Sequence, residues 1–287
     1  MLNAEGTPPF GGTHAEPWGR VLETAVGAVR AAGKLQMEWF RCDGGVEAFR
    51  RHDLKLKVDR MSEETIASVI RRSYPDHGIL GEETGRSPGR TGYLWIVDPL
   101  DGSVNYHHGI PHFCVSLACH LLPRASGGRG ETAAPVTGEP VVGVVYAPVT
   151  DELFCGVRGG GATCNGRPIR VGDVHSLEEA VIGFSFGSRE ETMQRMCAMS
   201  ASLARDARKL RAFGSTALDM AYVACGRMSG LIQGRVRCWD FAAARVILEE
   251  SGGLFRAKEV DPGGWEIIAC APGLLPHLKN LAGDVVA

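Results

Sequence analysis

Two acidic residues flank a turn in the segment 98–103 (DPLDGS). Pro99 fixes its own φ angle and Gly102 permits a tight turn, so we expect the chain to reverse sharply here. Such a turn can bring Asp98 and Asp101 to one side, with a main-chain carbonyl between them. Two carboxylates and a carbonyl are the hard oxygen ligands that Mg²⁺ prefers. The segment therefore predicts ligands for a magnesium ion.

Two further carboxylates stand where elements are expected to end. Glu82 follows the apolar run 78–81, and Asp240 follows Trp239 at an expected junction between a strand and a helix. Neighbouring carboxylates repel and raise each other's pKa, and a divalent ion relieves that conflict. The ion also supplies the charge neutralisation and the acidified water that phosphate chemistry requires. Each motif alone is more often a turn or a helix cap, so their joint placement carries the hypothesis.

The backbone after the acidic turn can serve the same chemistry. If a helix starts near Ser103, the N–H groups of Gly102 and Ser103 form an anion pocket beside the expected metal ligands. A phosphate group would then bridge the metal and the start of the helix.

Alternating strands and helices must position these groups. Apolar residues at helical spacing predict a first helix from Pro17 to near Gly33 or a few residues beyond, and a second helix that follows Asp59. Further helices are expected at 190–208, 216–226 and 241–251, and strands at 78–81, 93–97, 113–122, 141–146 and within 151–165. The polar segment 124–140 reads as a hairpin insertion. This order favours a layered α/β or α+β architecture.

Composition excludes several classes of protein. The chain has 287 residues, of which 44% are hydrophobic and 22% charged, so it can bury a core. Its net charge of −2 gives no support for a nucleic-acid partner. The longest apolar run, 113–122, is too short to span a membrane, and no signal peptide is visible at the start. Nine cysteines without a CxxC pair predict reduced thiols, and we expect a cytoplasmic protein.

Three sets of residues resemble the signature segments of the inositol monophosphatase family. They are 81–83 (GEE), 95–106 (WIVDPLDGSVNY), and 239–244 (WDFAAA) together with 250–253 (ESGG). This family belongs to the lithium-sensitive, magnesium-dependent phosphatases, which include fructose-1,6-bisphosphatase. The resemblance covers roughly residues 17–270 and implies a layered αβαβα sandwich like those two folds. It also implies homodimers, since members of the family are often dimeric.

The chain is expected to divide into three parts. Residues 1–16 are rich in Gly, Pro and Thr and lack periodicity, which predicts a flexible tail. Residues 17–180 would form an N-terminal α+β part with most of the metal ligands. Residues 181–287 would form a C-terminal α/β part that completes the active site between the two.

The resemblance implies two to three Mg²⁺ ions. The first would be held by Glu82, Asp98 and the carbonyl of Leu100. The second would be held by Asp98, Asp101 and Asp240.

The resemblance also assigns catalytic roles. Asp59 would hydrogen-bond Ser103 and support a third, weaker ion through water. Ser103 stands where relatives usually have Thr, and with Glu82 it would orient and deprotonate the attacking water. Many relatives have Val-Thr where this chain has Lys55 and Leu56, which distinguishes the surroundings of the third ion.

Substrate contacts are expected from two further segments. Gly214, Ser215 and Thr216 match a substrate-facing loop of the family, although Ser215 or Thr216 is as readily interpreted as a helix N-cap. Gln233 stands where inositol phosphatases commonly place a Glu that binds substrate hydroxyls. A neutral amide can both donate and accept a hydrogen bond there. The phosphate itself would lie against Gly102, Ser103 and Asp240.

The predicted function is Mg²⁺-dependent hydrolysis of a small phosphate monoester by a metal-activated water. Inositol monophosphate is the leading substrate, and fructose-1,6-bisphosphate, histidinol phosphate or a nucleotide 3′-phosphate are alternatives. A phosphatase-like scaffold whose main role is to bind a partner is a further hypothesis. The last hypothesis is a binuclear zinc hydrolase that uses His107, His108 and His112. Gly109 and Pro111 argue against the shared helical face that such a zinc site needs.

Overall fold

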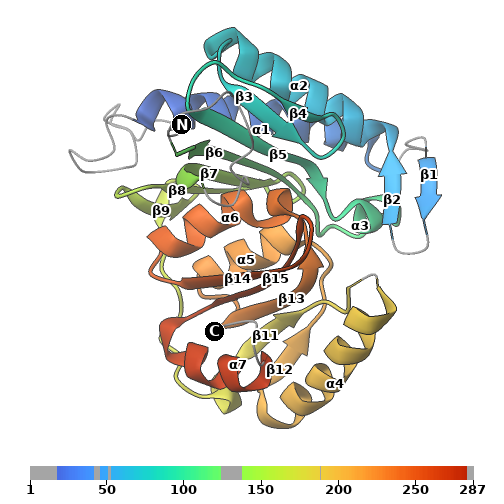
Figure 1. Ribbon diagram of the computed structural model, residues 1–287, viewed down its shortest axis with the longest axis vertical. Coiled ribbons are helices and arrows are strands. Elements are labelled where there is room, and N and C mark those ends of the chain that lie inside the picture. Colours follow the sequence, from blue (N-terminus) through green and yellow to red (C-terminus); the bar gives the residue numbers. More distant parts are fainter. Residues whose placement is uncertain (1–17, 42–45, 51–52, 124–137, 188, 283–287) are drawn as a thin grey trace.

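Helices and sheets alternate in five layers (Figure 1). The computed structural model describes residues 18–41, 46–50, 53–123, 138–187 and 189–282, so the expected tail and nearly all of the 124–140 insertion lie outside it. The helices are α1 (Gly19–Trp39), α2 (Lys57–Ser73), α3 (Ser103–His107), α4 (Glu190–Asp206), α5 (Thr216–Ala224), α6 (Cys238–Glu250) and α7 (Leu275–Ala282). Helices α1 and α2 cover one sheet, α5 and α6 lie between the two sheets, and α4 and α7 cover the other. The arrangement confirms the expected αβαβα sandwich.

The first sheet has eight strands in the order β10-β9-β8-β7-β6-β5-β3-β4. In chain order the strands are β3 (Gly78–Gly81), β4 (Gly85–Ser87), β5 (Tyr93–Asp101), β6 (Cys114–Leu121), β7 (Glu139–Ala147), β8 (Glu152–Val157), β9 (Gly161–Cys164) and β10 (Arg167–Pro168). Strands β3 and β5 are parallel, and the other neighbours pair antiparallel. Because parallel strands end at the same edge, the residues that follow β3 and β5 are brought together.

The second sheet has five strands in the order β12-β11-β13-β15-β14. They are β11 (Val181–Phe184), β12 (Lys209–Arg211), β13 (Gly230–Val236), β14 (Leu254–Asp261) and β15 (Gly264–Cys270). A separate hairpin pairs β1 (Val46–Arg50) with β2 (Asp53–Leu56). The division of the chain at residue 180 stays a prediction. Within the described ranges, no helix is long and apolar enough to cross a membrane.

Helix α6 packs directly on the backbone of the first sheet. A Cβ atom on Gly143 of β7 would lie 2.2 Å from the Ala243 carbonyl oxygen, and one on Gly156 of β8 would lie 2.7 Å from Ile247 Cα. Only glycine therefore allows so close a contact. The buried face of α6, which includes Phe241, joins the largest apolar cluster of the protein. This packing sets where the first turn of α6 lies.

Helices α1 and α2 differ in extent from the sequence prediction. Helix α1 passes Gly33, where a Cβ atom would meet the Tyr146 ring at 2.6 Å, and continues to Trp39. Helix α2 begins at Lys57, so the expectation that it follows Asp59 was wrong. Asp59 instead lies within the first turn, where an acidic side chain can bond the free N–H groups of the helix start.

Candidate functional site

A β-bulge interrupts β5 between the two aspartates of the acidic turn. Asp98 pairs with Ser116 and Asp101 pairs with Cys114, so three steps along β5 match two along β6. Pro99 explains the irregularity, because it cannot donate a ladder hydrogen bond. The bulge redirects the chain at the end of the strand, which is how bulges re-aim side chains near active sites.

Gln36 of α1 stabilises this bulge through a side-chain hydrogen bond. Its side chain is fully buried, and its Nε2 atom donates to the carbonyl of Pro99 over 2.6 Å. The N–H group of Leu100 donates to Asp98 Oδ1 over 3.2 Å. Nothing in the sequence singled out Gln36, because its partner lies on a different element and the rest of the helix reads as an ordinary apolar stripe.

The Asp101 carboxylate, at the end of β5, contacts the start of α5 and caps that helix. Its Oδ2 atom accepts hydrogen bonds from the Ser215 hydroxyl and from the Ala217 N–H group, both over 2.7 Å. Burial raises the pKa of Asp101, and the hydrogen bonds from Ser215 and Ala217 oppose that rise. The hydroxyl of Ser215 therefore supports Asp101, and its expected contact with substrate stays a prediction.

The turn after Asp101 has the glycine that its geometry requires. Gly102 has φ 93° and ψ 35°, and a Cβ atom there would lie 3.0 Å from the His112 carbonyl oxygen. Helix α3 starts at Ser103, as expected. Within α3, Asn105 Nδ2 donates to the carbonyls of His112 and Phe213, both over 2.7 Å. Asn105 thereby ties the acidic turn to the loop that precedes α5.

The turn that carries Glu82 is held by a second buried acid. Glu63 of α2 accepts hydrogen bonds from the N–H groups of Glu83 and Thr84, over 2.8 and 2.9 Å. A Cβ atom on Gly81 would lie 2.1 Å from Glu63 Oε1, so glycine is needed where the carboxylate passes. The Glu82 N–H group also reaches the carbonyl of Val97 over 3.3 Å, which joins the turn to β5.

Asp59 and Asp240 occupy equivalent places on two helices. Each stands at the third position of its helix and accepts a hydrogen bond from the backbone N–H group three residues earlier. In α2 the donor is Leu56 and the distance to Asp59 Oδ2 is 2.8 Å. In α6 the donor is Arg237 and the distance to Asp240 Oδ2 is also 2.8 Å. The positive end of each helix thus helps to stabilise a carboxylate.

The charges of these groups act on one another. Burial, followed by the charge of Asp240, raises the pKa of Glu82 well above its ordinary value. Burial, followed by the charges of Glu82 and Asp101, does the same to Asp98, and Asp240 and Asp59 add to it. Coulomb interactions weaken as the distance between charges grows. The fold therefore brings these acids, which are far apart in sequence, into one electrostatic cluster.

This donor set fits a divalent cation. Buried carboxylates that raise each other's pKa gain most from a hard cation that neutralises them. In the described part of the chain, however, no three His, Cys, Asp or Glu side chains already form a metal-binding group. The assignment of Glu82, Asp98, Leu100, Asp101 and Asp240 as ligands stays a prediction.

The remaining expected substrate residues lie in three settings. Gly214 is exposed and Thr216 is half-buried at the start of α5. Gln233 is 3% exposed on β13, beside a register shift against β15. No hydrogen bond within the described residues joins Gln233 to the acidic cluster, so its contact with a substrate stays a prediction.

The three histidines of the zinc hypothesis do not converge. His107 and His108 are exposed, whereas the Nε2 atom of His112 lies 2.8 Å from Asp219 Oδ1. Burial raises the pKa of Asp219 to about 6, although His112 opposes the rise. Helix α3 ends at His107, so the histidines share no helical face. His112 instead joins the loop after α3 to α5.

The described cysteines show no sign of redox chemistry. All eight are free, and five of them are buried. Burial raises the pKa of Cys225, and it raises that of Cys238 to about 12. A thiol with a raised pKa forms little of the reactive thiolate. The five buried cysteines pack as small apolar groups, and the expectation of reduced thiols stays a prediction.

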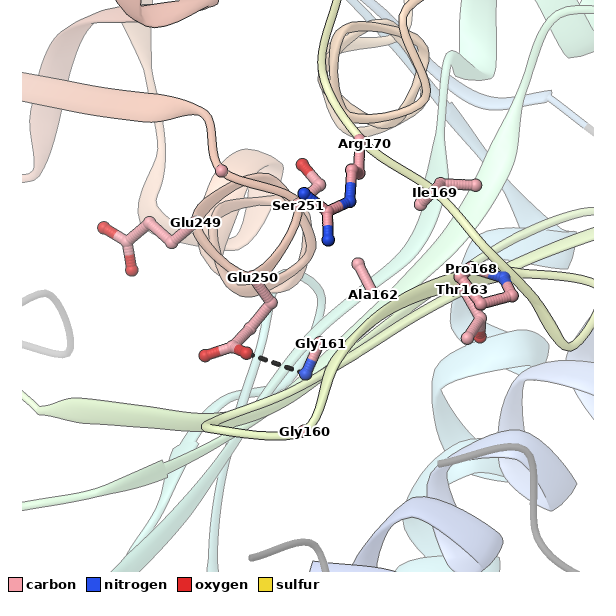
Figure 2. A pocket seen from close by; sticks show the side chains of 11 residues that line it. Gly160, Gly161, Ala162, Thr163, Pro168, Ile169, Arg170, Glu249, Glu250 and Ser251 are labelled. Atoms are coloured by element: carbon pink, nitrogen blue, oxygen red, sulfur yellow. Dashed lines mark hydrogen bonds between the residues drawn. The ribbon is translucent and has the colours of Figure 1, made fainter. Parts of the chain in front are cut away.

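A cavity of about 450 Å³ lies at the other end of α6, away from the acidic cluster (Figure 2). Its wall includes Glu250, Ser251 and Gly252, which belong to one of the segments that resemble the family. The Glu250 carboxylate accepts hydrogen bonds from the N–H groups of Gly159 and Gly161, each over 2.9 Å. The neighbouring Glu249 pairs with Arg245. Both acids at this end of α6 therefore have a structural role.

Comparison with known proteins agrees with the architecture. The pattern that describes the inositol monophosphatase family matches residues 18–278. A protein named Nus factor SuhB, from Pasteurella multocida, is 36% identical over 268 residues, which are 91% of this chain and 94% of the relative. The protein of the same name from Escherichia coli K12 is 36% identical over 239 residues, or 82% of this chain and 84% of the relative.

Solved structures give the same result. The extragenic suppressor protein suhB of Bartonella henselae superposes with a TM-score of 0.82 at 30% identity, over 92% of this chain and 99% of that protein. The inositol monophosphatase of Anabaena sp. PCC 7120 superposes with a TM-score of 0.76 at 33% identity, over 92% and 95% of the two chains. The similarity extends over nearly the whole length of both proteins.

Proposed function

The chain belongs to the inositol monophosphatase family, and on this premise we propose that it hydrolyses a small phosphate monoester with the help of Mg²⁺. The observation that carries the proposal is the electrostatic coupling of Asp98 to Glu82, Asp101 and Asp240, which are buried or half-buried. A protein gains nothing in stability from such a cluster unless a cation or a proton neutralises it.

The acidic groups divide the expected ions between them. Glu82, Asp98 and the Leu100 carbonyl would hold one Mg²⁺, and Asp98, Asp101 and Asp240 would hold another. When bound, these ions supply charge neutralisation for the phosphate and an acidified water as the nucleophile. Asp98 would be shared by both ions, which is consistent with its central place in the cluster.

The protein's own groups orient the reactants. Glu82 and Ser103 would direct the attacking water and accept its proton, and Asp59 would fix the Ser103 hydroxyl. The N–H groups of Gly102 and Ser103 would bind phosphate oxygens whose charge grows in the transition state. The bulge and the positive φ angle of Gly102 aim the backbone for this role.

The alcohol part of the substrate is a finer question. We propose inositol monophosphate as the leading substrate, bound at Gly214, Thr216 and Gln233. Because the Gln233 amide is neutral, it selects hydroxyl groups less strongly than a carboxylate would. Fructose-1,6-bisphosphate, histidinol phosphate and nucleotide 3′-phosphates remain alternatives on the same catalytic centre.

A phosphate-release screen tests the proposal. The purified chain is incubated with each of these esters at millimolar Mg²⁺, and parallel reactions contain a chelator. We expect release that requires Mg²⁺ and that ranks the alcohols. Turnover of none of the esters would favour the alternative of a binding scaffold, which the name Nus factor SuhB of the relatives keeps in view. Sedimentation of the same sample tests the expected homodimer.

A further inference from the structure

Lys55 places an ammonium group at the edge of the acidic cluster. It lies near the end of β2, immediately before α2, and its Nζ atom is 2.6 Å from Glu83 Oε1. The two side chains are 25% and 14% exposed. Solvent therefore screens this ion pair less than it would screen a pair on the surface.

The partner of Lys55 is fixed in place. Glu83 belongs to the turn whose N–H groups are bound by the buried carboxylate of Glu63. That turn also carries Glu82. The ion pair with Glu83 therefore holds the ammonium group at a defined position beside the turn that carries Glu82, a predicted metal ligand.

The charge of Lys55 reaches the cluster itself. Burial, then Asp240 and Glu83, raises the pKa of Glu82, and Lys55 opposes these effects. The charges that act on Asp98 are all acidic. Lys55 is thus a cation of the protein that partly neutralises the side of the cluster on which Glu82 lies.

We propose that Lys55 is a built-in cation of the site, which takes the neutralising place of one Mg²⁺ so that the chain binds two ions and not three. The inference rests on the proposed function, since it concerns the same carboxylates. An ammonium group can balance charge but cannot acidify a water molecule as a metal ion does. Lys55 therefore replaces the weaker ion expected near Asp59, and leaves the other two to the chemistry.

Calorimetric titration of the chelator-treated full chain with Mg²⁺ tests this inference. We expect two ions in the wild type. In Lys55→Met a third Mg²⁺ ion should bind. The affinity of this variant for Mg²⁺ should be about three- to tenfold higher than that of the wild type, because a repelling positive charge has been removed. Glu83→Gln should shift the affinity in the opposite direction. Lys57→Met is the matched control, since Lys57 lies over the Trp39 ring and is exposed.

Opposite shifts in the two charge variants separate an electrostatic role from structural damage, which would weaken binding in both. Lys55→Arg keeps the charge and should behave as the wild type. Three ions in the wild type, or equal affinities in Lys55→Met and Lys57→Met, would overturn the inference.

Asp98→Asn separates failure of the inference from failure of the proposed function. If Asp98→Asn binds Mg²⁺ as the wild type does, and the wild type hydrolyses none of the esters, the proposed function fails. If Asp98→Asn loses Mg²⁺ binding while Lys55→Met matches Lys57→Met, the inference about Lys55 fails alone.

Discussion

Ser215 donates its hydroxyl to Asp101 Oδ2 over 2.7 Å, although the two residues are 114 positions apart in the chain. The bond joins the end of β5 in the first sheet to the start of α5. A predicted metal ligand is thus oriented by a residue far away in the sequence, and its carboxylate also caps α5.

Ser215→Ala should weaken Mg²⁺ binding and catalysis together. Loss of a supporting hydrogen bond to a ligand typically costs about 10- to 100-fold in metal affinity or activity. Titration with Mg²⁺ and steady-state rates measure the two effects. Ser200→Ala on α4 is the control, because that hydroxyl bonds only within its own helix turn. Unchanged Mg²⁺ affinity in Ser215→Ala would show that Asp101 needs no such support.

Asp98→Asn should abolish Mg²⁺ binding and lower turnover by at least about 10²–10³-fold, as expected when a major electrostatic stabiliser is lost. The same change should stabilise the protein in the presence of chelator, because it removes a buried charge that its neighbours repel. Thermal unfolding with and without Mg²⁺ measures this reversal. Asp173→Asn, at an exposed site, should leave both properties unchanged.

Mg²⁺ affinity should fall as the pH is lowered. Folded Glu82 and Asp98 have pKa values well above their ordinary ones, so protons compete with the cation at higher pH than for a normal carboxyl group. Binding in the pH range where these groups titrate should then release protons. Calorimetry in buffers of different ionisation enthalpy detects that release, and a binding heat independent of the buffer would contradict the prediction.

Asp219 should make the protein less stable as the pH rises from about 4 to about 6. Its pKa is about 6 in the folded protein, whereas an unfolded Asp titrates near 4. The unfolded state therefore loses its proton first, and ionisation costs the folded state up to roughly 3 kcal/mol. Asp219→Asn removes this slope. Denaturant midpoints of both proteins across this range, measured with chelator, should diverge as the pH rises.

Gly143→Ala should destabilise the protein and displace Asp240. The added methyl group would lie 2.2 Å from the Ala243 carbonyl oxygen, which forces α6 away from β7. We expect a loss of about 3 kcal/mol, at the upper end of overpacking effects, together with weaker Mg²⁺ binding. In Gly27→Ala the new Cβ atom meets nothing within 4 Å, so this exposed helix position should become slightly more stable.

The sequence was most informative where one local pattern determines the structure. Strand β3 and the core of β5 follow from short apolar runs, and each is followed directly by acidic residues. Pro99 and Gly102 mark the turn through their own backbone restrictions. A layered α/β or α+β architecture and the placement of these acids at the strand ends could therefore be anticipated from the residues, whereas the αβαβα order was implied by the resemblance to the family.

Long-range partners could not be predicted in this way. Gln36 supports the site through an amide hydrogen bond and Glu63 through its carboxylate, and each stands in a segment with no unusual pattern. The sequence pointed to Ser215 as a substrate contact or a helix cap, but not as the partner of Asp101. Their roles depend on which element packs beside them. Most individual strands of the second sheet were not predicted for a related reason, because strands such as β14 carry many charged residues and have little apolar alternation.

The close packing of α6 on Gly143 and Gly156 affects when the acidic cluster is completed during synthesis of the chain. Asp240 leaves the ribosome long after Asp98, and it reaches its place only when the helix that carries it docks on a sheet built from earlier residues. A nascent chain that lacks this helix lacks one acidic residue of the proposed cation site. The proposed cation site is therefore completed late in the biogenesis of the protein.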